Sequence, residues 1–349
     1  MKNHLFYAFF LVPAVLYASS AELPSPEAKT LATALYQNWQ NVRNLEGTMQ
    51  TTGVSGFSED KEAGPATIQL EIDPIKKIPV ARLPEKILAP VTTASWKLCD
   101  DGSFFMKWAQ SYPQNTRIDR QVTPILEITT TWDREFFNEM SSNNGEGAIL
   151  SIKSSLPARI NAFVSEDFLA MPFRFMIPTS YETAMSQFPS LEFLKNPTSY
   201  KQLLQSCKYM GKEDVLGAKC EVFELDGGVG IWDNKPVKYK IYLNVSEDLF
   251  PIGWDEISSR DSVLRREYRV NEIGKLPLDG GIFRYAKNAS LTYFKPAKGG
   301  EKPEVNVAYQ TVVDFIKLNG TEAFDYTLDP ASASIIYDLD KKQAITVPR

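Results

Sequence analysis

The residue types that carry most enzyme chemistry are scarce in this chain. Its only histidine is His4, which lies in a stretch that we expect to be removed from the mature protein. Histidine is the commonest general base and a frequent metal ligand, because its pKa lies near neutrality. We therefore expect no Ser-His-Asp or Cys-His arrangement and no histidine-bound zinc. Mechanisms that use carboxylates alone, or a serine with a lysine, stay open.

Two short motifs resemble the nucleophile sites of hydrolases. Ser58 and Lys61 have the S-x-x-K spacing of serine-lysine enzymes, but the two acids between them favour a charged lysine, whereas the mechanism needs a neutral one. Residues 53–57 approach the G-x-S-x-G elbow, but Phe57 replaces the last glycine and no histidine partner exists. We interpret both motifs as non-catalytic loop segments.

Acidic residues and glycines give no stronger signal. Asp338 and Asp340, with Asp329 upstream, lack the spacing of an EF-hand loop, so we interpret them as a solvated, charged end of the chain. Gly228 and Gly230 resemble part of a dinucleotide-binding loop, but no third glycine and no βαβ pattern complete it. We therefore predict no catalytic residue, no cofactor and no metal ion, and we predict that the protein is not an enzyme.

Three cysteines remain, Cys99, Cys207 and Cys220. An odd number of cysteines in an exported chain means that at least one thiol is free, that one cysteine forms a bridge to another chain, or that all three are reduced. Cys207 and Cys220 flank a segment that fits a β-hairpin, so a disulfide between them is one hypothesis. The other is that both are ordinary, half-buried thiols.

The composition is typical of a soluble globular protein. Of the 349 residues, 43% are hydrophobic and 23% are charged. These fractions argue against a disordered chain or a multi-pass membrane protein. The net charge of −5 offers no basic surface to phosphates, so we expect no nucleic-acid partner.

The first residues have the pattern of a secretory signal peptide. Lys2 precedes an almost wholly apolar run over 5–18, and three small residues follow, ending at Ala21. A run of about 14 apolar residues is too short to span a bilayer. We expect residues 1–21 to be removed by cleavage near Ala21. The mature protein is then periplasmic or secreted, and any association with a membrane is peripheral at most.

The first mature element is predicted to be an amphipathic helix. Ser25 can cap it, and Pro26 suits the first helical position. Apolar residues then recur every three or four positions, which places them on one face that we expect to pack against a sheet. The residues of this face are Leu31, Leu35, Trp39 and Val42.

Segments in which apolar and polar residues alternate dominate the rest of the chain. Such alternation predicts antiparallel strands with one covered face and one wetter face, and we expect roughly ten of them. Examples are 68–72, 104–108 after the turn at 100–102, 148–152, 237–243 and 305–313.

The middle of the chain has a different character. Between 157 and 206 the alternation is lost, helix-like pieces occur, and four prolines divide the segment. We expect residues 22–349 to form one domain, with a mostly helical insertion around 157–206 that covers one side of the sheet. A small separate domain is the alternative.

Several aromatic residues lie on or near the predicted strands. The simplest interpretation is a hydrophobic core. A second is that a curved sheet holds some of them on a concave, incompletely filled face that accepts an apolar ligand. The residues are Trp96, Phe104, Phe105, Trp108, Trp132, Phe136 and Trp254.

The order of these elements and several local patterns resemble the superfamily of periplasmic outer-membrane lipoprotein carriers and lipoprotein-sorting proteins (LolA/RseB/LppX-like). Residues 211–225 are similar to a strand-turn-strand segment of its sorting members. Residues 240–243 followed by 249–252 look like the strand, turn and strand of those proteins. Residues 324–338 are similar to their F-x-F-T…P…V-x-D ending, and residues 101–105 resemble their DG hairpin before aromatic residues.

The resemblance implies a mainly β fold of the α+β class. The sheet would be a strongly curved antiparallel sheet or incomplete β-barrel covered by helices, and its interior would hold an apolar cavity. The resemblance also implies a turn around 215–217. That turn would pair Cys220 near Gly211 or Lys212 and would disfavour the disulfide with Cys207.

The function that follows is that of a non-catalytic periplasmic carrier or chaperone, which holds a lipid or the acyl chain of a lipoprotein. One alternative is an envelope module on the same fold that binds a protein partner or acts as a sensor, and another is a hydrolase that works with carboxylates only. For the carrier, the predicted cavity residues are Leu31, Leu35, Trp39, Trp96, Phe104, Trp108, Ile241 and Trp254.

Overall fold

The computed structural model describes most of the chain from residue 26 onward. The described ranges are 26–56, 69–72, 79–82, 89–111, 126–143, 146–155, 172, 194–195, 197–229, 236–295, 303–320 and 327–347. The predicted signal peptide lies outside the described residues, and so does most of the predicted insertion at 157–206.

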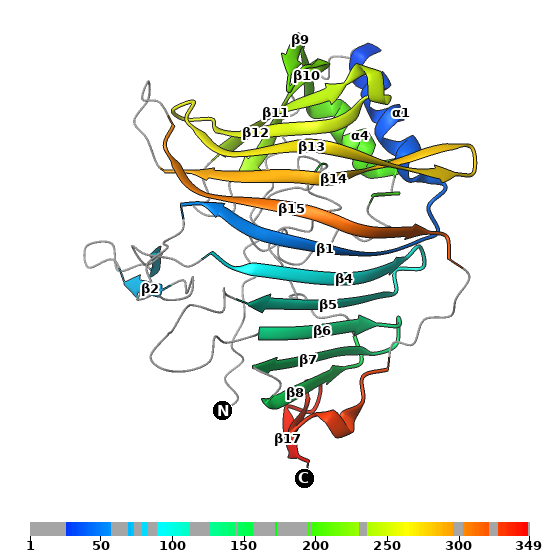
Figure 1. Ribbon diagram of the computed structural model, residues 1–349, viewed down its shortest axis with the longest axis vertical. Helices are drawn as coiled ribbons and strands as arrows, with labels where there is room; N and C mark the ends of the chain where they lie inside the picture. Colours follow the sequence, from blue (N-terminus) through cyan, green and yellow to red (C-terminus); the bar gives the residue numbers. More distant parts are fainter. Residues whose placement is uncertain are drawn as a thin grey trace, which may run out of the picture.

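Fifteen strands form one curved, open sheet (Figure 1). Its order is β17-β16-β8-β7-β6-β5-β4-β1-β15-β14-β13-β12-β11-β10-β9, and β2 and β3 form a separate pair. The strand bounds are β1 Asn44–Ser55, β2 Gln69–Ile72, β3 Pro79–Arg82, β4 Val91–Cys99, β5 Phe104–Ser111, β6 Leu126–Trp132, β7 Phe137–Asn143, β8 Glu146–Lys153, β9 Cys207–Val215, β10 Ala218–Val229, β11 Pro236–Asn244, β12 Phe250–Ser258, β13 Leu264–Leu278, β14 Gly281–Phe294, β15 Val305–Leu318, β16 Ile335–Asp338 and β17 Gln343–Thr346.

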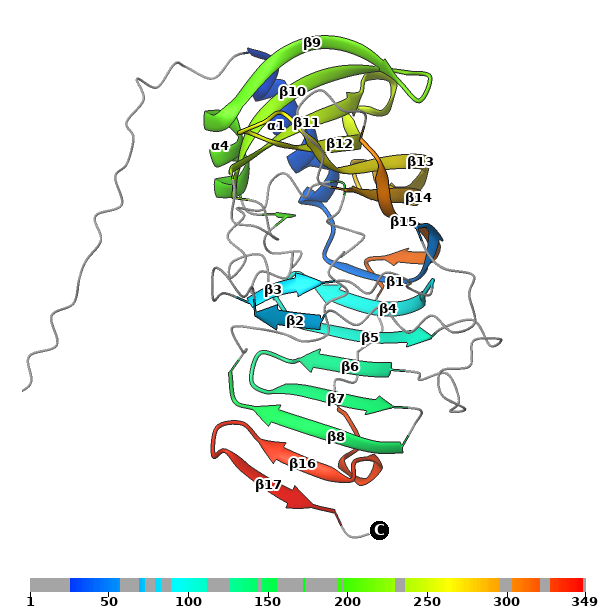
Figure 2. The same ribbon diagram turned by 90° about the vertical axis from the view of Figure 1, so that its left-hand side faces the viewer.

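The sheet is almost entirely antiparallel, as the sequence predicts. Among the strands that the structure describes, the pair β8–β16 alone is parallel. Within the described residues, the terminal strands β9 and β17 do not pair with each other, so the sheet stays unclosed. Figure 2 shows that the curvature is strongest at the β9–β12 end, which arches over, whereas β4–β8 form a flatter ladder.

Local sequence explains the individual strands and turns. In β11 the side chains of Val237, Tyr239 and Ile241 are buried, as the alternation predicts. The predicted turn at 100–102 joins β4 to β5. There Gly102 has a positive φ of 85°, and the carboxylate of Asp101 accepts a hydrogen bond from the Ser103 amide at 2.9 Å. Such a turn suits glycine and aspartate because both fit backbone conformations that other residues avoid.

Helix α1 (Pro26–Gln40) buries the predicted apolar face. Leu31, Leu35 and Trp39 are almost completely covered. The Trp39 ring meets Phe283 of β14 edge-on, with the ring centres 5.1 Å apart. A second helix, α4 (Pro197–Ser206), packs against α1, and Tyr36 meets Tyr200 there at 5.4 Å. The two helices also contact β9, β10 and β14.

The cysteines do not form the disulfide considered above. In the β9–β10 hairpin, Cys207 lies opposite Leu225 and Cys220 lies opposite Glu213. The two thiols are therefore far apart, and neither takes part in a disulfide. The turn is at 216–217, as the resemblance implied, and Cys220 lies opposite Glu213, next to Lys212. Burial raises the pKa of Cys207 to about 12 and that of Cys220 to about 11.

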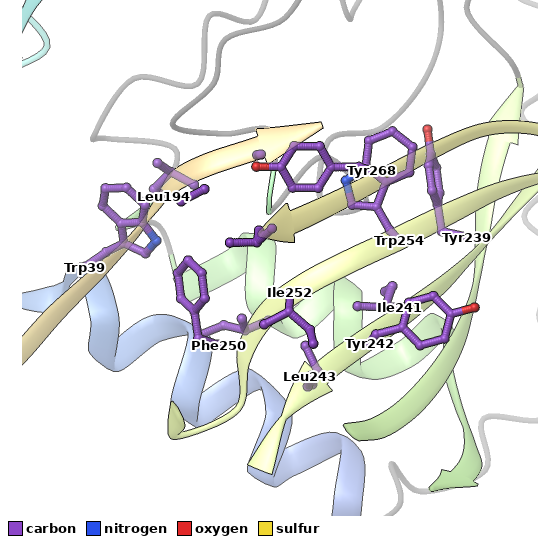
Figure 3. Packing of buried hydrophobic residues seen from close by; sticks show 14 of the residues in the cluster. Trp39, Leu194, Tyr239, Ile241, Tyr242, Leu243, Phe250, Ile252, Trp254 and Tyr268 are labelled. Carbon is purple, nitrogen blue, oxygen red and sulfur yellow. The ribbon is translucent and has the colours of Figure 1, made fainter. Parts of the chain in front are cut away.

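One large hydrophobic cluster fills the space between the helices and the strands. Figure 3 shows part of it, with Trp39 from α1 and Phe250, Ile252 and Trp254 from β12. Of the aromatic residues singled out in the sequence, Phe105 and Phe136 do not belong to this cluster, and Phe136 lies exposed in the turn between β6 and β7.

Candidate ligand-binding groove

A groove of about 1040 Å³ runs along the exposed side of helix α1. Nine of the 15 residues of α1, between Glu27 and Gln40, line one wall, and a helix of 15 residues spans about 22 Å. The opposite wall comes from β10, from the turn between β11 and β12, and from the turn between β13 and β14. In Figure 1 these two turns lie at the ends of the strands beside α1. The groove is therefore long, and its volume is that of a typical ligand site.

Of the 22 residues that line the groove, twelve are polar or charged and eight are apolar. Leu35, Phe223 and Phe250 belong at the same time to the hydrophobic core, so they join the groove to it. Val245 and Ile282 also line the groove, and they are 46% and 48% exposed. An apolar ligand that covers these exposed side chains would gain free energy from their burial.

The turn between β11 and β12 has a defined local cause. Asn244 caps the short 3-10 helix η2 (Val245–Glu247), because its side chain accepts a hydrogen bond from the Ser246 amide at 3.0 Å. Asp248 and Leu249 follow with positive φ angles of 50° and 60°. This conformation costs L-residues free energy, but it projects Glu247, Asp248 and Leu249 towards the groove.

An ion cluster lies at one side of the groove, around Arg284 of β14. Its Nε donates to Glu247 at 3.3 Å, and its Nη2 donates to Asp248. Lys275 also donates to Glu247, at 2.7 Å. Burial alone would raise the pKa of Glu247, but hydrogen bonds from Lys275 and Arg284 outweigh it and hold the pKa below its usual value. Glu247 is therefore kept ionised, which is the opposite of what a general acid requires.

Two asparagines fix the helical wall to the sheet. The Asn38 side chain accepts a hydrogen bond from the Arg284 amide at 2.9 Å and donates one to its carbonyl oxygen at 3.0 Å. Asn41 donates to the carbonyl oxygen of Asp279 at 2.6 Å. These bonds tie the C-terminal end of α1 and the residue that follows it to β14 and to the turn before β14. They therefore hold the two walls of the groove together at this end.

The predicted cavity residues gather in the core rather than in the groove. All eight belong to one hydrophobic cluster. Seven of the eight are buried in it, and Trp108 is partly buried and packs against it. Among them, only Leu35 also lines the groove. That they form a lipid cavity stays a prediction. The eight residues are Leu31, Leu35, Trp39, Trp96, Phe104, Trp108, Ile241 and Trp254.

Sequence reasoning missed the ion cluster and the asparagines. Glu247 and Asp248 stand in a polar stretch that indicates only a turn, and Arg284 is one of many charged residues on strands. The signal that could have found them is the placement of Val245 and Leu249, two apolar residues within that otherwise polar turn.

A second polar cluster is buried among the aromatic residues of the core. Glu256 accepts hydrogen bonds from Tyr239 at 2.8 Å and from Nε of Arg266 at 3.1 Å. Arg266 also lies over the ring of Trp254, 5.5 Å from its centre. By contrast, the hydroxyl of Tyr268 is buried and has no hydrogen-bond partner in the structure as described.

Neither a metal site nor a membrane-spanning helix is found in the described part of the chain. No three histidine, cysteine, aspartate or glutamate side chains gather there as metal ligands would. None of the helices described is both long enough and apolar enough to cross a bilayer.

Comparison with known proteins gives similarity at the level of the fold. No protein-family model and no curated protein match the sequence. A DUF1329 family protein from Desulfovibrio piger has a TM-score of 0.43 and 10% identity, with 86% of this chain and 96% of that chain covered. An outer membrane lipoprotein-sorting protein domain from Vibrio parahaemolyticus has a TM-score of 0.41 and 8% identity, with 85% and 93% covered.

Proposed function

We propose that this protein is a non-catalytic binding protein of the cell envelope that carries an amphipathic ligand, either a lipid or the acyl chain of a lipoprotein. The groove along α1 is the binding site. The observation that carries the proposal is the exposure of Val245 and Ile282 inside a groove of about 1040 Å³ that also reaches core residues. The envelope location rests on the signal-peptide pattern of the first 21 residues.

The energetics suit an acyl chain. Each buried methylene contributes about 0.8 kcal/mol, so ten of them supply about 8 kcal/mol. That free energy corresponds to a Kd of about 1 μM, before the cost of ordering the ligand is subtracted. A chain that lies along α1 can reach Leu249, Phe250 and Ile282 in turn. In this proposal α1 forms one wall of the ligand site.

Filling the groove tests the proposal directly. Ala34 is half-buried in the middle of α1 and lines the groove, so Ala34→Trp places a bulky ring there. Ala344 on the distant strand β17 is exposed, and Ala344→Trp is the matched control. Binding of a fluorescent fatty acid is titrated for both variants, after circular dichroism has shown that each is folded.

We expect Ala34→Trp to weaken binding by a factor of at least about ten, since a loss of 1.4 kcal/mol already produces that factor. The control should bind as the wild type does. Native mass spectrometry of protein purified without detergent should also show an acylated species near one per chain. A folded Ala34→Trp variant with unchanged affinity would mean that the groove is not the site.

A protein-binding module is the second candidate, and the free edge of β17 favours it. All four residues of β17 are exposed, and Ile345 is 60% exposed. Within the described chain, β17 pairs only with β16, so its other edge can accept an extended segment of a partner. A stoichiometric envelope protein that co-purifies with the wild type and with Ala34→Trp, but not with Ala344→Pro, would support this function instead.

A further inference from the structure

We infer that Arg284 is the subsite for an anionic headgroup, a phosphate or carboxylate, and that Asp248 holds this position in the ligand-free protein. The inference deepens the proposed function, because it names the polar part of the ligand that the groove accepts. It rests on the contacts of one guanidinium and on the contrast between its two acidic partners.

Arg284 is placed as a recognition residue would be. Its side chain lines the groove and is only 13% exposed, so water screens it weakly. Of the five N–H donors of a guanidinium, Arg284 uses one towards Glu247, one towards Asp248 and one towards the carbonyl oxygen of Ile282 at 3.4 Å. Two donors are therefore left for a further acceptor, and a fork of such donors matches the geometry of phosphate and carboxylate.

The two acidic partners of Arg284 are not equivalent. Glu247 is 19% exposed and is also held by Lys275, so it is a fixed part of the cluster. Asp248 is 78% exposed, has no other ion pair among the described residues, and stands in a left-handed conformation. Ion pairs with such an exposed partner contribute little to stability. Asp248 can therefore leave Arg284 at small cost, whereas Glu247 cannot.

Arg284 stays paired when a ligand anion takes the place of Asp248. The guanidinium keeps Glu247 and exchanges one carboxylate for another anion, while the exposed Asp248 carboxylate turns towards water. The groove lining also carries Lys29 and the carboxylates of Glu27 and Glu221, so the positive charge that meets the ligand is that of Arg284. The apolar side chains next to this position in sequence, Leu249 and Ile282, would then contact the part of the ligand that follows its headgroup.

The test compares lipids that differ only in headgroup charge. The probes are a single-chain lipid with a phosphate headgroup, the uncharged monoacylglycerol with the same chain, and glycerol phosphate without a chain. Three variants are titrated with each probe. Arg284→Gln removes the proposed anion contact, Asp248→Asn removes the competing charge, and Lys295→Gln breaks an exposed ion pair with Glu304 as the control. Asparagine tolerates the left-handed conformation, so Asp248→Asn should fold normally.

We expect Asp248→Asn to bind the phosphate lipid several-fold more tightly and Arg284→Gln to bind it about tenfold more weakly, the scale of one charge-assisted contact. Each change should alter the affinity for monoacylglycerol less than the affinity for the phosphate lipid, and Lys295→Gln should alter neither affinity. The preference for the phosphate lipid should also shrink as salt is added.

Each other result has a distinct meaning. If Asp248→Asn leaves the affinity for the phosphate lipid unchanged or weakens it, the inferred exchange is wrong, and this holds even if Arg284→Gln does not fold. If Arg284→Gln weakens both lipids equally, the residue is structural and the inference also fails. If glycerol phosphate binds as tightly as the phosphate lipid, the anion subsite stands, but the proposed lipid-carrier function fails.

Discussion

The buried hydroxyl of Tyr268 allows a prediction whose sign is unusual for a core residue. Its side chain is 3% exposed, and its oxygen has no hydrogen-bond partner in the described structure. The ring itself is well packed, stacked on Trp254 with the ring centres 5.7 Å apart. Tyr268→Phe removes the unpaired oxygen and keeps these contacts. Because an unsatisfied buried polar group costs about 1–3 kcal/mol, we expect the variant to be more stable by about 1 kcal/mol.

Tyr239 provides the matched control, since its hydroxyl is equally buried but donates to Glu256 at 2.8 Å. Loss of a hydrogen bond to a charged group costs about 1.5–3 kcal/mol, so Tyr239→Phe should be destabilised by that amount. Both variants delete one oxygen from a buried tyrosine, and the structure alone assigns them opposite signs.

Urea unfolding followed by tryptophan fluorescence measures both changes. With a slope of about 3 kcal/mol/M, 1 kcal/mol moves the midpoint by about 0.3 M, and equal slopes show that the unfolded state is unchanged. A lower midpoint for Tyr268→Phe would refute the reasoning, because it would mean that the hydroxyl has a stabilising partner in solution.

Three further predictions concern the ionisable groups. Removal of one partner of the buried pair, as in Glu256→Gln or Arg266→Met, should cost about 3–5 kcal/mol in urea unfolding, and a cost below 1 kcal/mol would show that water reaches the pair. The pKa of Glu247 is lowered by folding, so its contribution is full above its unfolded pKa of about 4.3 and is lost as the pH falls through the folded value. The stability advantage of the wild type over Glu247→Gln should therefore disappear in acid. Because burial raises the pKa of Cys207 to about 12 and that of Cys220 to about 11, neither thiol of the folded protein should react quickly with iodoacetamide at pH 8, and intact mass should show no disulfide between them.

The sequence predicted those features that depend on neighbours along the chain. Helix α1 begins at Pro26 and buries the face of Leu31, Leu35 and Trp39, because helical spacing alone brings these residues together. The hairpin turn at 216–217 follows from its glycine and from the strands beside it. Local patterns of this kind need no knowledge of the partner element.

Features that need distant segments could not be predicted. The ion cluster joins Asp248 to Arg284 across 36 positions, and no local pattern links a turn residue to a strand residue so far away. The closure of the sheet is a similar case. Alternation indicates which face of a strand is covered, but it does not determine whether the first and last strands of a sheet meet. The resemblance, rather than the alternation, implied a strongly curved antiparallel sheet or incomplete barrel, and an open, curved sheet is observed.

The central position of β1 determines the order in which the molecule can fold. On one side β1 pairs with β4, which begins 36 positions after the end of β1. On the other side β1 pairs with β15, where the hydroxyls of Thr51 and Thr311 form a hydrogen bond. The half from β4 to β8 and the half from β9 to β14 can each form from successive hairpins, whereas their union must wait until residues 305–318 are available. Contacts this distant in sequence form slowly, and until they form β1 offers a long unpaired edge to other chains. We expect chains truncated before β15 to aggregate rather than to fold partially.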